Sequence, residues 1–427
     1  MSENVQKTLR DSAALRWLAL ILLAGAMFCS YIFMDILSPI KDLMWDTKGW
    51  DSTAFGTMQG SETFLNVFVF FLIFAGIILD KMGVRFTAIL SGAVMLVGAT
   101  INWYALTDMF AGSNLEVWFN EHLNYIPGFD ELGVSPFYKG MPASAKFSAI
   151  GFMIFGCGVE MAGITVSRGI VKWFKGREMA LAMGSEMALA RLGVATCMIF
   201  SPMFARLGGE VSVSRSVAFG VVLLMIALIM FIVYAFMDKK LDSQTGEAEE
   251  KDDPFKLSDL GKILTDSGFW LVALLCVLYY SAIFPFQKYA VNMLQCNLVF
   301  HQVDPSSIWA SNTITIIQYV IMLVVAACAF ASNFSKNKVA KYGLMGVAIV
   351  ALVVFCYMGY MRQSAETVFA VFPLLAVGIT PILGNYVDHK GKAATMLVLG
   401  SLLLIACHLT FAFVLPAFKG SEVGGII

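Results

Sequence analysis

The sequence predicts an all-α polytopic membrane protein. Of its 427 residues, 59% are hydrophobic and only 14% are charged, whereas about a quarter of the residues in a soluble globular protein are charged. The mean hydropathy is +0.76. Apolar runs long enough to cross about 30 Å of hydrocarbon as helices lie at 17–38, 60–79, 86–107, 147–171, 178–204, 216–237, 269–290, 308–332, 343–361, 366–385 and 394–416.

The first of these runs predicts an uncleaved spanning helix. Basic residues precede it, as in a signal peptide. However, the run from Trp17 to Ile40 is as long as a spanning helix, and the bulky Phe28 before Cys29 argues against a lipoprotein site. With the N-terminus cytoplasmic, most of the 29 Lys and Arg residues fall in cytoplasmic segments, as the positive-inside rule requires.

Composition also excludes several classes of function. A net charge of −1 leaves no basic face for nucleic acid. The eight cysteines form no CxxC pair, so we expect neither a disulfide scaffold nor a metal site. We find no nucleophile elbow or phosphate-binding loop, and we therefore expect neither an enzyme nor a cofactor.

Two polar stretches interrupt the apolar runs. Residues 238–267 are highly charged and predict a cytoplasmic linker, in which Phe255 to Leu264 has the pattern of a short amphipathic helix. The outer stretch 108–146 is rich in aromatic residues, among them Trp118, Tyr125, Phe129 and Phe137, and also contains Pro127. We expect it to act as an interfacial anchor in preference to a cap over an entrance.

Two loops carry the same GxxxDxxG motif. Its residues and their basic neighbours are Gly76, Asp80, Lys81, Gly83 and Arg85 in the first loop and Gly384, Asp388, His389, Gly391 and Lys392 in the second. The first glycine predicts close helix packing, and the second predicts a tight turn with positive φ. The aspartate can bind at a helix N-terminus or pair with an arginine. Two copies in equivalent loops indicate an internal duplication and suggest a gating role.

This motif resembles the conserved loop of the major facilitator superfamily. Further stretches are similar to the branch that contains the lysosomal dipeptide uniporters and their bacterial relatives, and they lie at 30–35, 155–160, 172–184, 190–193, 279–286 and 387–392. The resemblance covers most of residues 16–300 and 366–416. It implies a bundle of two helical halves in a cell membrane, in the bacterial case the inner membrane.

The resemblance also defines the expected domains. Residues 1–237 are the N-terminal six-helix half, 238–267 the linker, and 268–427 the C-terminal half. Two departures from the family pattern stand out. Two extra helices are inserted at about 308–361, and the chain stops after the family's ninth helix. We expect a fragment that lacks the last three helices, with a shortened natural protein as the alternative.

Glu160 and Arg191 are opposite charges near the middle of neighbouring apolar runs. They lie 11 residues before position 171 and 13 after position 178. At a rise of 1.5 Å per residue, both are roughly 17–20 Å from the inner face, close to the midplane where transporter sites form. A charge at this depth costs at least a few kcal/mol. The pair is therefore either a structural salt bridge or a grip for the two termini of a zwitterion.

The resemblance favours the second interpretation. In the related branch, the matching Glu and Arg bind the amino and carboxyl ends of a peptide. We accordingly predict substrate contacts for these two residues and for polar residues of the first and seventh helices, namely Tyr31, Asp35, Tyr279, Tyr280, Gln287 and Lys288. Pro285 in the seventh helix permits a kink.

Other polar groups in apolar runs have open roles. Glu186 lies about 140° around the helix from Arg191, and it is either a proton-titrating carboxylate or a polar bundle contact. We expect Arg168 to snorkel and Glu62, like Asp35, to be hydrated near an outer helix end. For His408 we expect packing or a local hydrogen bond.

The leading functional hypothesis is a transporter of dipeptides or related zwitterions that works by alternating access, with uniport implied by the resemblance. Its partners are a small-molecule substrate and the lipid bilayer, and the related branch also allows an accessory membrane subunit. Two alternatives stay open. One is an exporter of another small organic solute, and the other is a membrane scaffold or sensor that has a transporter-like fold.

Overall fold

The computed structural model describes residues 8–123, 137–138, 140–245, 261, 263–335 and 337–422. The chain forms two compact units, one of Met1–Gly193 with Phe204–Phe255 and one of Val194–Met203 with Lys256–Ile427. Most of the predicted linker, the aromatic residues Tyr125 and Phe129 with Pro127, and the C-terminal tail lie outside the described residues.

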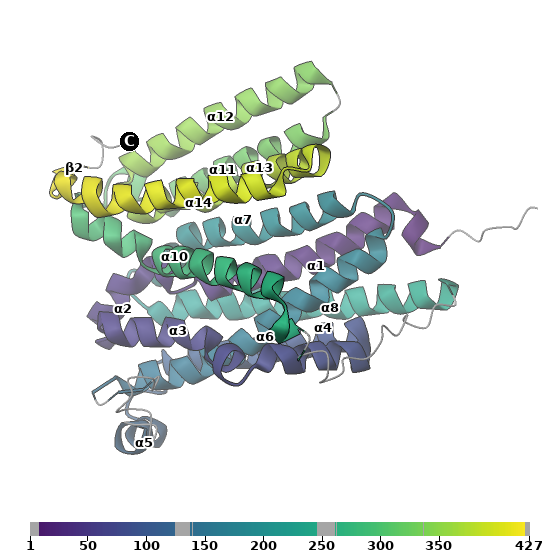
Figure 1. The fold of residues 1–427 in the computed structure, drawn as a ribbon. Helices are drawn as coiled ribbons and strands as arrows, with labels where there is room; N and C mark the ends of the chain where they lie inside the picture. The colour runs from purple at the N-terminus through teal and green to yellow at the C-terminus, as the bar shows by residue number, and fades with distance from the viewer. Residues whose placement is uncertain are drawn as a thin grey trace, which may run out of the picture. The chain divides into compact units, whose positions relative to one another are not determined.

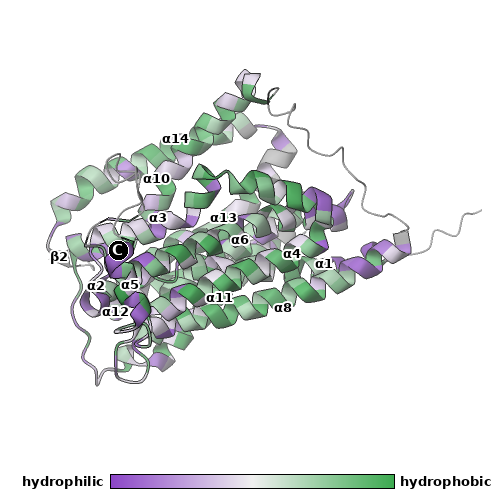
Figure 2. Ribbon diagram, turned by 90° about the horizontal axis from the view of Figure 1, so that it is seen from below, coloured by the Kyte–Doolittle hydropathy of each residue, from purple (hydrophilic) through white to green (hydrophobic). Residues whose placement is uncertain are grey.

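The helices confirm the predicted all-α membrane fold. Nine helices in the described ranges are long and apolar enough to cross a membrane, and they span Ala13–Lys48, Phe71–Ala105, Ala143–Phe174, Leu181–Ala205, Val213–Gln244, Ser267–Asn297, Asn312–Ser332, Lys338–Met361 and Ala394–Phe418. Figure 2 shows α8 (Val213–Thr245) as hydrophobic over most of its length, and the segment before α1 (Ala13–Met34) as hydrophilic.

In the described ranges, eight α-helices contribute residues to the first unit (Figure 1). Besides α1 and α8 they are α2 (Lys41–Lys48), α3 (Ser52–Phe68), α4 (Phe71–Ala105), α5 (Asn114–His122), α6 (Ala143–Phe174) and α7 (Met179–Ala205). Short 3-10 helices at Leu9–Asp11 and Ser38–Ile40 flank α1. Within the unit, α6 packs against α1, α3 and α4, and α8 packs against α1 and α4.

Five further α-helices of the described ranges belong to the second unit. They are α10 (Ser267–Asn297), α11 (Asn312–Phe334), α12 (Lys338–Met361), α13 (Ala365–Lys390) and α14 (Ala393–Leu409), followed by π-helical and 3-10 turns at Thr410–Val414 and Leu415–Phe418. The short strands β1 (Leu298–Val299) and β2 (Ser421–Glu422) pair in parallel. Here α13 contacts α10, α11 and α12, and thus joins the inserted pair α11 and α12 to its neighbours.

The predicted run 60–79 is divided between α3 and α4, and α4 joins the second half of that run to most of the run 86–107 at Gly83. This glycine has φ 80° and ψ 168°, values that are not helical. Contacts with α6 show that the chain reverses here. Ser61 and Asn66 of α3, which precede the turn, bond to Ala149 and Gly156, so the chain there runs parallel to α6. After Gly83, Gly98 approaches Gly151 and Met95 approaches Gly158. The chain there runs antiparallel to α6.

The two copies of the loop motif share a positive φ at the second glycine. Gly391, between α13 and α14, also has a positive φ of 64°. The predicted positive φ at the second glycine is therefore confirmed in both loops. The expected close packing at the first glycine is wrong for Gly76, because nothing lies within 4 Å of where its Cβ would be.

The described part of the outer aromatic stretch packs onto the start of α6. Phe119 of α5 is buried with Phe110 and Ala143, and Figure 1 shows α5 beside the N-terminal end of α6. In contrast, the side chain of Trp118 is 46% exposed. One face of α5 thus belongs to the core of the unit, while another remains open.

Candidate functional site

Four charged side chains of the first unit lie close enough to Tyr31 for their charges to act on its hydroxyl. The charges of Arg191, Glu186, Glu160 and Glu62, in decreasing order of effect, all act electrostatically on the Tyr31 hydroxyl. Together with Tyr31, these residues come from α1, α3, α6 and α7, far apart in the sequence. We refer to these five residues as the Tyr31 cluster. Three of its members, Tyr31, Glu160 and Arg191, are predicted substrate-binding residues.

Two glycines bring the helices of the cluster into close contact. A methyl group at Gly156 would overlap the backbone carbonyl of Glu62, so α3 and α6 touch directly there. A methyl group at Gly193 would lie 2.6 Å from the carbonyl oxygen of Phe28 and 3.4 Å from Cβ of Tyr31. Because Gly156 is one turn before Glu160 and Gly193 is two residues after Arg191, these contacts position the charged side chains.

Glu160 and Arg191 do not form a salt bridge with each other. Among the described residues, neither Glu160 nor Arg191 has an ion-pair or hydrogen-bond partner, and both side chains are partly exposed. Glu186 is 4% exposed and likewise has no such partner within the described ranges. The structural salt bridge considered from the sequence is thus absent between these two side chains.

Glu62 and Asp35 are more deeply buried than the sequence suggested. Glu62 is 7% exposed and Asp35 is fully buried, so the expectation that both are hydrated at outer helix ends is wrong. For Glu62 the cause is the glycine contact that draws α3 onto α6. Asp35 accepts a 3.4 Å hydrogen bond from Ser38, whose hydroxyl also accepts one from Gln59. The sequence alone does not group Glu62 with the site, although it is the one charged residue in α3.

The predicted residues of α10 belong to the second unit. Tyr279 donates to the carbonyl oxygen of Leu397 at 2.8 Å and lies 2.8 Å from the Ser401 hydroxyl, which fastens α10 to α14. Tyr280 is 53% exposed. Gln287 and Lys288 are buried, past the proline at position 285 inside the helix.

His408 has the local role that the sequence predicted. Its Nδ1 lies 3.0 Å from the carbonyl oxygen of Leu404, and its Nε2 lies 3.2 Å from that of Ala282. The ring also packs near Phe286. His408 therefore links α14 to α10 by hydrogen bonding and packing.

The first loop motif is held by ion pairs. Asp80 pairs with Arg168 at 2.5 Å, and Arg85 pairs with Asp242 at 3.0 Å. Arg168 therefore has a protein partner, whereas we expected it to snorkel to the membrane surface. Lys81 is exposed. In the second loop, Lys392 is exposed as well, while the side chains of Asp388 and His389 and the surroundings of Gly384 lie outside what the structure describes.

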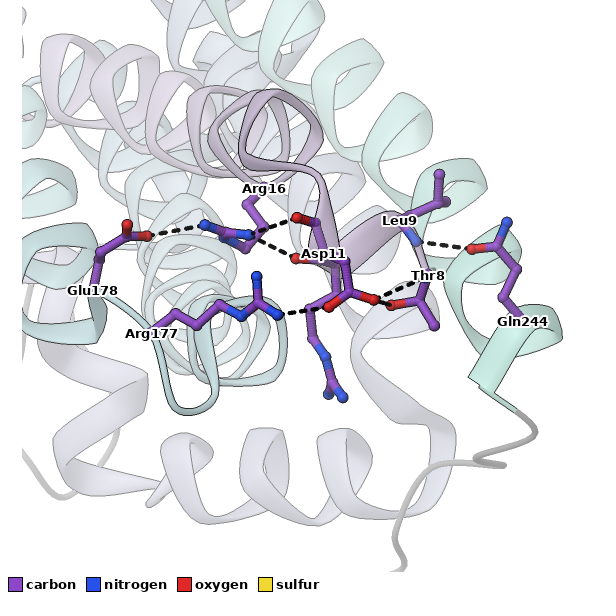
Figure 3. A network of polar contacts seen from close by, with 8 residues as sticks. Thr8, Leu9, Asp11, Arg16, Arg177, Glu178 and Gln244 are labelled. Carbon is purple, nitrogen blue, oxygen red and sulfur yellow. Dashed lines mark hydrogen bonds and ion pairs between the residues drawn. The ribbon is translucent and has the colours of Figure 1, made fainter. Parts of the chain in front are cut away.

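A second polar network ties the N-terminal segment to the loop between α6 and α7 (Figure 3). Arg177 pairs with Asp11 at 2.6 Å, and Arg16 pairs with Glu178 at 3.1 Å. The backbone N–H and hydroxyl of Thr8, together with Arg177, lower the pKa of Asp11 from its usual range. Ion pairs between residues so far apart in the sequence gave no signal in the sequence analysis.

An apolar groove in the second unit offers no alternative site for a charged solute. It has a volume of about 470 Å³ and is lined only by Ile321, Val324, Gly346, Val347, Val350, Ala351 and Val354 of α11 and α12. A zwitterion placed there would lose its hydration without gaining a hydrogen bond from a side chain. The Tyr31 cluster is therefore the better candidate.

The comparisons with known proteins agree with this architecture. Residues 23–366 match the Major Facilitator Superfamily. The lysosomal dipeptide transporter MFSD1 of Homo sapiens is 24% identical over 280 residues, which are 64% of this chain and 52% of that protein. MFSD1 of Gallus gallus is 29% identical over 145 residues, 32% of each chain. This chain thus spans about a third to a half of the length of these curated relatives.

Solved transporter structures are also similar. A bacterial homologue of the human drug peptide transporters PepT1 and PepT2 matches with a TM-score of 0.45 and 13% identity, over 92% of this chain and 99% of that chain. The xylose transporter XylE from E. coli matches with a TM-score of 0.43 and 10% identity, over 88% and 99%. Because the family match extends over more than half of its residues, this chain belongs to the Major Facilitator Superfamily.

Proposed function

We propose that this membrane protein transports small zwitterionic solutes, most specifically dipeptides and related peptides, by alternating access. The observation that carries this proposal is the pair of opposite charges, Glu160 and Arg191, which act on the same Tyr31 hydroxyl but have no partner within the described ranges. Charges inside a membrane protein need counter-charges. A zwitterion supplies both.

Each member of the pair has a distinct role in this proposal. Glu160 accepts hydrogen bonds from the substrate ammonium group, and Arg191 binds its carboxylate through two parallel hydrogen bonds. The Tyr31 hydroxyl donates a hydrogen bond to the substrate between them. Asp35 and the residues of α10 stay predictions from the sequence, and Asp35 requires a rearrangement of α1 to reach a solute because it is fully buried.

The relatives support the proposed substrate class. Proteins named lysosomal dipeptide transporters match this chain at 22–30% identity. We propose uniport in a bacterial inner membrane with a cytoplasmic N-terminus, and we assign the ion pair of Asp80 and Arg168 to gating. Glu186 is the residue through which a proton would be coupled, and a transport rate that does not respond to a pH gradient would exclude that coupling.

Uptake into proteoliposomes tests the proposal. We expect the purified protein to take up a radiolabelled dipeptide, and we expect Glu160→Gln and Arg191→Ala each to abolish uptake while the proteins still elute as a single species. Arg191→Lys keeps the charge but loses the planar two-point contact, so it should restore little activity. Glu121→Gln, which changes an exposed acid of α5, serves as the matched control and should transport normally.

Other outcomes would separate the alternatives. Normal uptake by both site variants would refute the site assignment. Thermal stabilisation by organic acids or lipophilic cations, with none by dipeptides, would favour the exporter. A membrane partner that copurifies with a protein stabilised by no solute would favour the scaffold or sensor.

A further inference from the structure

The position of Glu62 relative to Glu160 is fixed by backbone contacts. The carbonyl of Glu62 lies against Gly156, one helical turn before Glu160 on the same face of α6. Hydrogen bonds on both sides of this contact set the register, because the Ser61 hydroxyl donates to the Ala149 carbonyl at 2.9 Å and the Asn66 amide donates to the Gly156 carbonyl at 3.2 Å. Two carboxylates from adjacent helices therefore occupy neighbouring levels of the unit.

The carboxylates of Glu160 and Glu62 both act on the Tyr31 hydroxyl. Glu160 and Glu62 act in the same sense on the Tyr31 hydroxyl, and Arg191 acts in the opposite sense. With Glu186, the Tyr31 cluster contains three carboxylates and one guanidinium group. Glu160 is the residue to which we assign the substrate ammonium group, and the backbone contact at Gly156 places Glu62 of the adjacent helix one helical turn from it.

Resting on the proposed function, we propose that Glu62 is a second carboxylate of the ammonium subsite and determines specificity for a free amino terminus. An ammonium group has three N–H donors. It can therefore donate to Glu160, to Glu62 and to the Tyr31 oxygen at once. A carboxylate has about four acceptor positions, so Glu62 can bind the ammonium and keep its protein contacts.

A comparison of matched ligands tests this role. We would measure competition against a labelled dipeptide by the same dipeptide, by its C-terminal amide and by its desamino analogue, in which hydrogen replaces the ammonium group. Charge-assisted hydrogen bonds predict that Glu62→Gln weakens binding of the first two ligands by roughly 10- to 100-fold. Binding of the desamino analogue should be the same in the variant and the wild type.

Two further variants keep the test decisive. Glu62→Asp retains the charge on a shorter side chain and should bind the free-amine ligands more tightly than Glu62→Gln. Glu121→Gln removes an exposed acid of α5 and should change nothing. Size-exclusion elution and thermal melting check folding, and the Asp variant carries the comparison if the Gln variant does not fold.

Failure of this inference is distinguishable from failure of the proposed function. If the wild-type protein binds dipeptides and Glu62→Gln binds them equally well, Glu62 is not part of the subsite. If Glu62→Gln weakens all three ligands by the same factor, its role is structural only. If the wild-type protein binds no dipeptide at all, the proposed function itself falls, and this inference falls with it.

Discussion

Gly156 of α6 and Glu62 of α3 touch through their backbones, and no side chain larger than hydrogen fits at position 156. Glu62 is the single charged residue of its helix, yet it is 7% exposed. The absence of a side chain on Gly156 explains this burial, because it removes the spacing that side chains normally impose between helices. A glycine in one helix thus sets the depth of an acid in another.

Gly156→Ala should therefore disturb both stability and ligand binding. The added methyl group overlaps the Glu62 carbonyl, so α3 must shift away from α6. Overpacking of this kind costs about 1–3 kcal/mol. We expect a lower apparent melting temperature in detergent and a loss of dipeptide binding, since Glu62 and Glu160 would separate.

Gly163→Ala in the same helix is the matched control. Nothing lies within 4 Å of the Cβ that it would introduce, and alanine favours a helix over glycine by about 1 kcal/mol. Its melting temperature should be unchanged or higher, with binding retained. Equal losses in both variants would mean that α6 is sensitive to any substitution, and the packing argument would then be wrong.

The turn at Gly83 gives a second prediction. Its φ of 80° and ψ of 168° fall in a region that is essentially restricted to glycine, where another residue costs about 1–3 kcal/mol. Gly83→Ala should lower the apparent melting temperature, whereas Gly76→Ala, at the open first glycine of the motif, should not. The opposite order of the two melting temperatures would contradict the assignment of the turn.

The helices were predictable because hydrophobic runs and their lengths report directly on membrane crossing. The turn glycines were predictable for a similar reason. Asp80 and Gly83 lie between two runs, where the chain has to reverse, and the same holds for Gly391. In each case the signal is local in the sequence.

The features that the sequence did not reveal depend on contacts between distant segments. The level of Glu62 is set by Gly156, which lies 94 positions later (156 − 62). Arg168 meets Asp80 across 88 positions, so the isolated helix suggested snorkelling instead. The ends of an apolar run predict the depth of a residue along its own helix. They do not predict which neighbouring helix comes close enough to bury that residue or to pair with it.

A third prediction concerns Tyr138, which lies outside the spanning helices. Its hydroxyl donates a 2.9 Å hydrogen bond to Asp51, and Asp51 in turn accepts from the Ala54 N–H at the start of α3. Burial, followed by the bond to Asp51, raises the pKa of Tyr138 from its ordinary value of 10.0 to about 12. The protonated hydroxyl is therefore favoured by the folded state.

The sign of the resulting pH dependence follows from linkage. Because the folded-state pKa is raised, the contribution of Tyr138 to stability is complete below pH 10 and is lost as the pH rises through about 12. The difference in melting temperature between the wild type and Tyr138→Phe should accordingly be largest at pH 9 and should shrink towards pH 12. The Phe variant acts as the control because other tyrosines titrate equally in both proteins. A difference that stays constant over this interval would show that the bond to Asp51 does not anchor the start of α3.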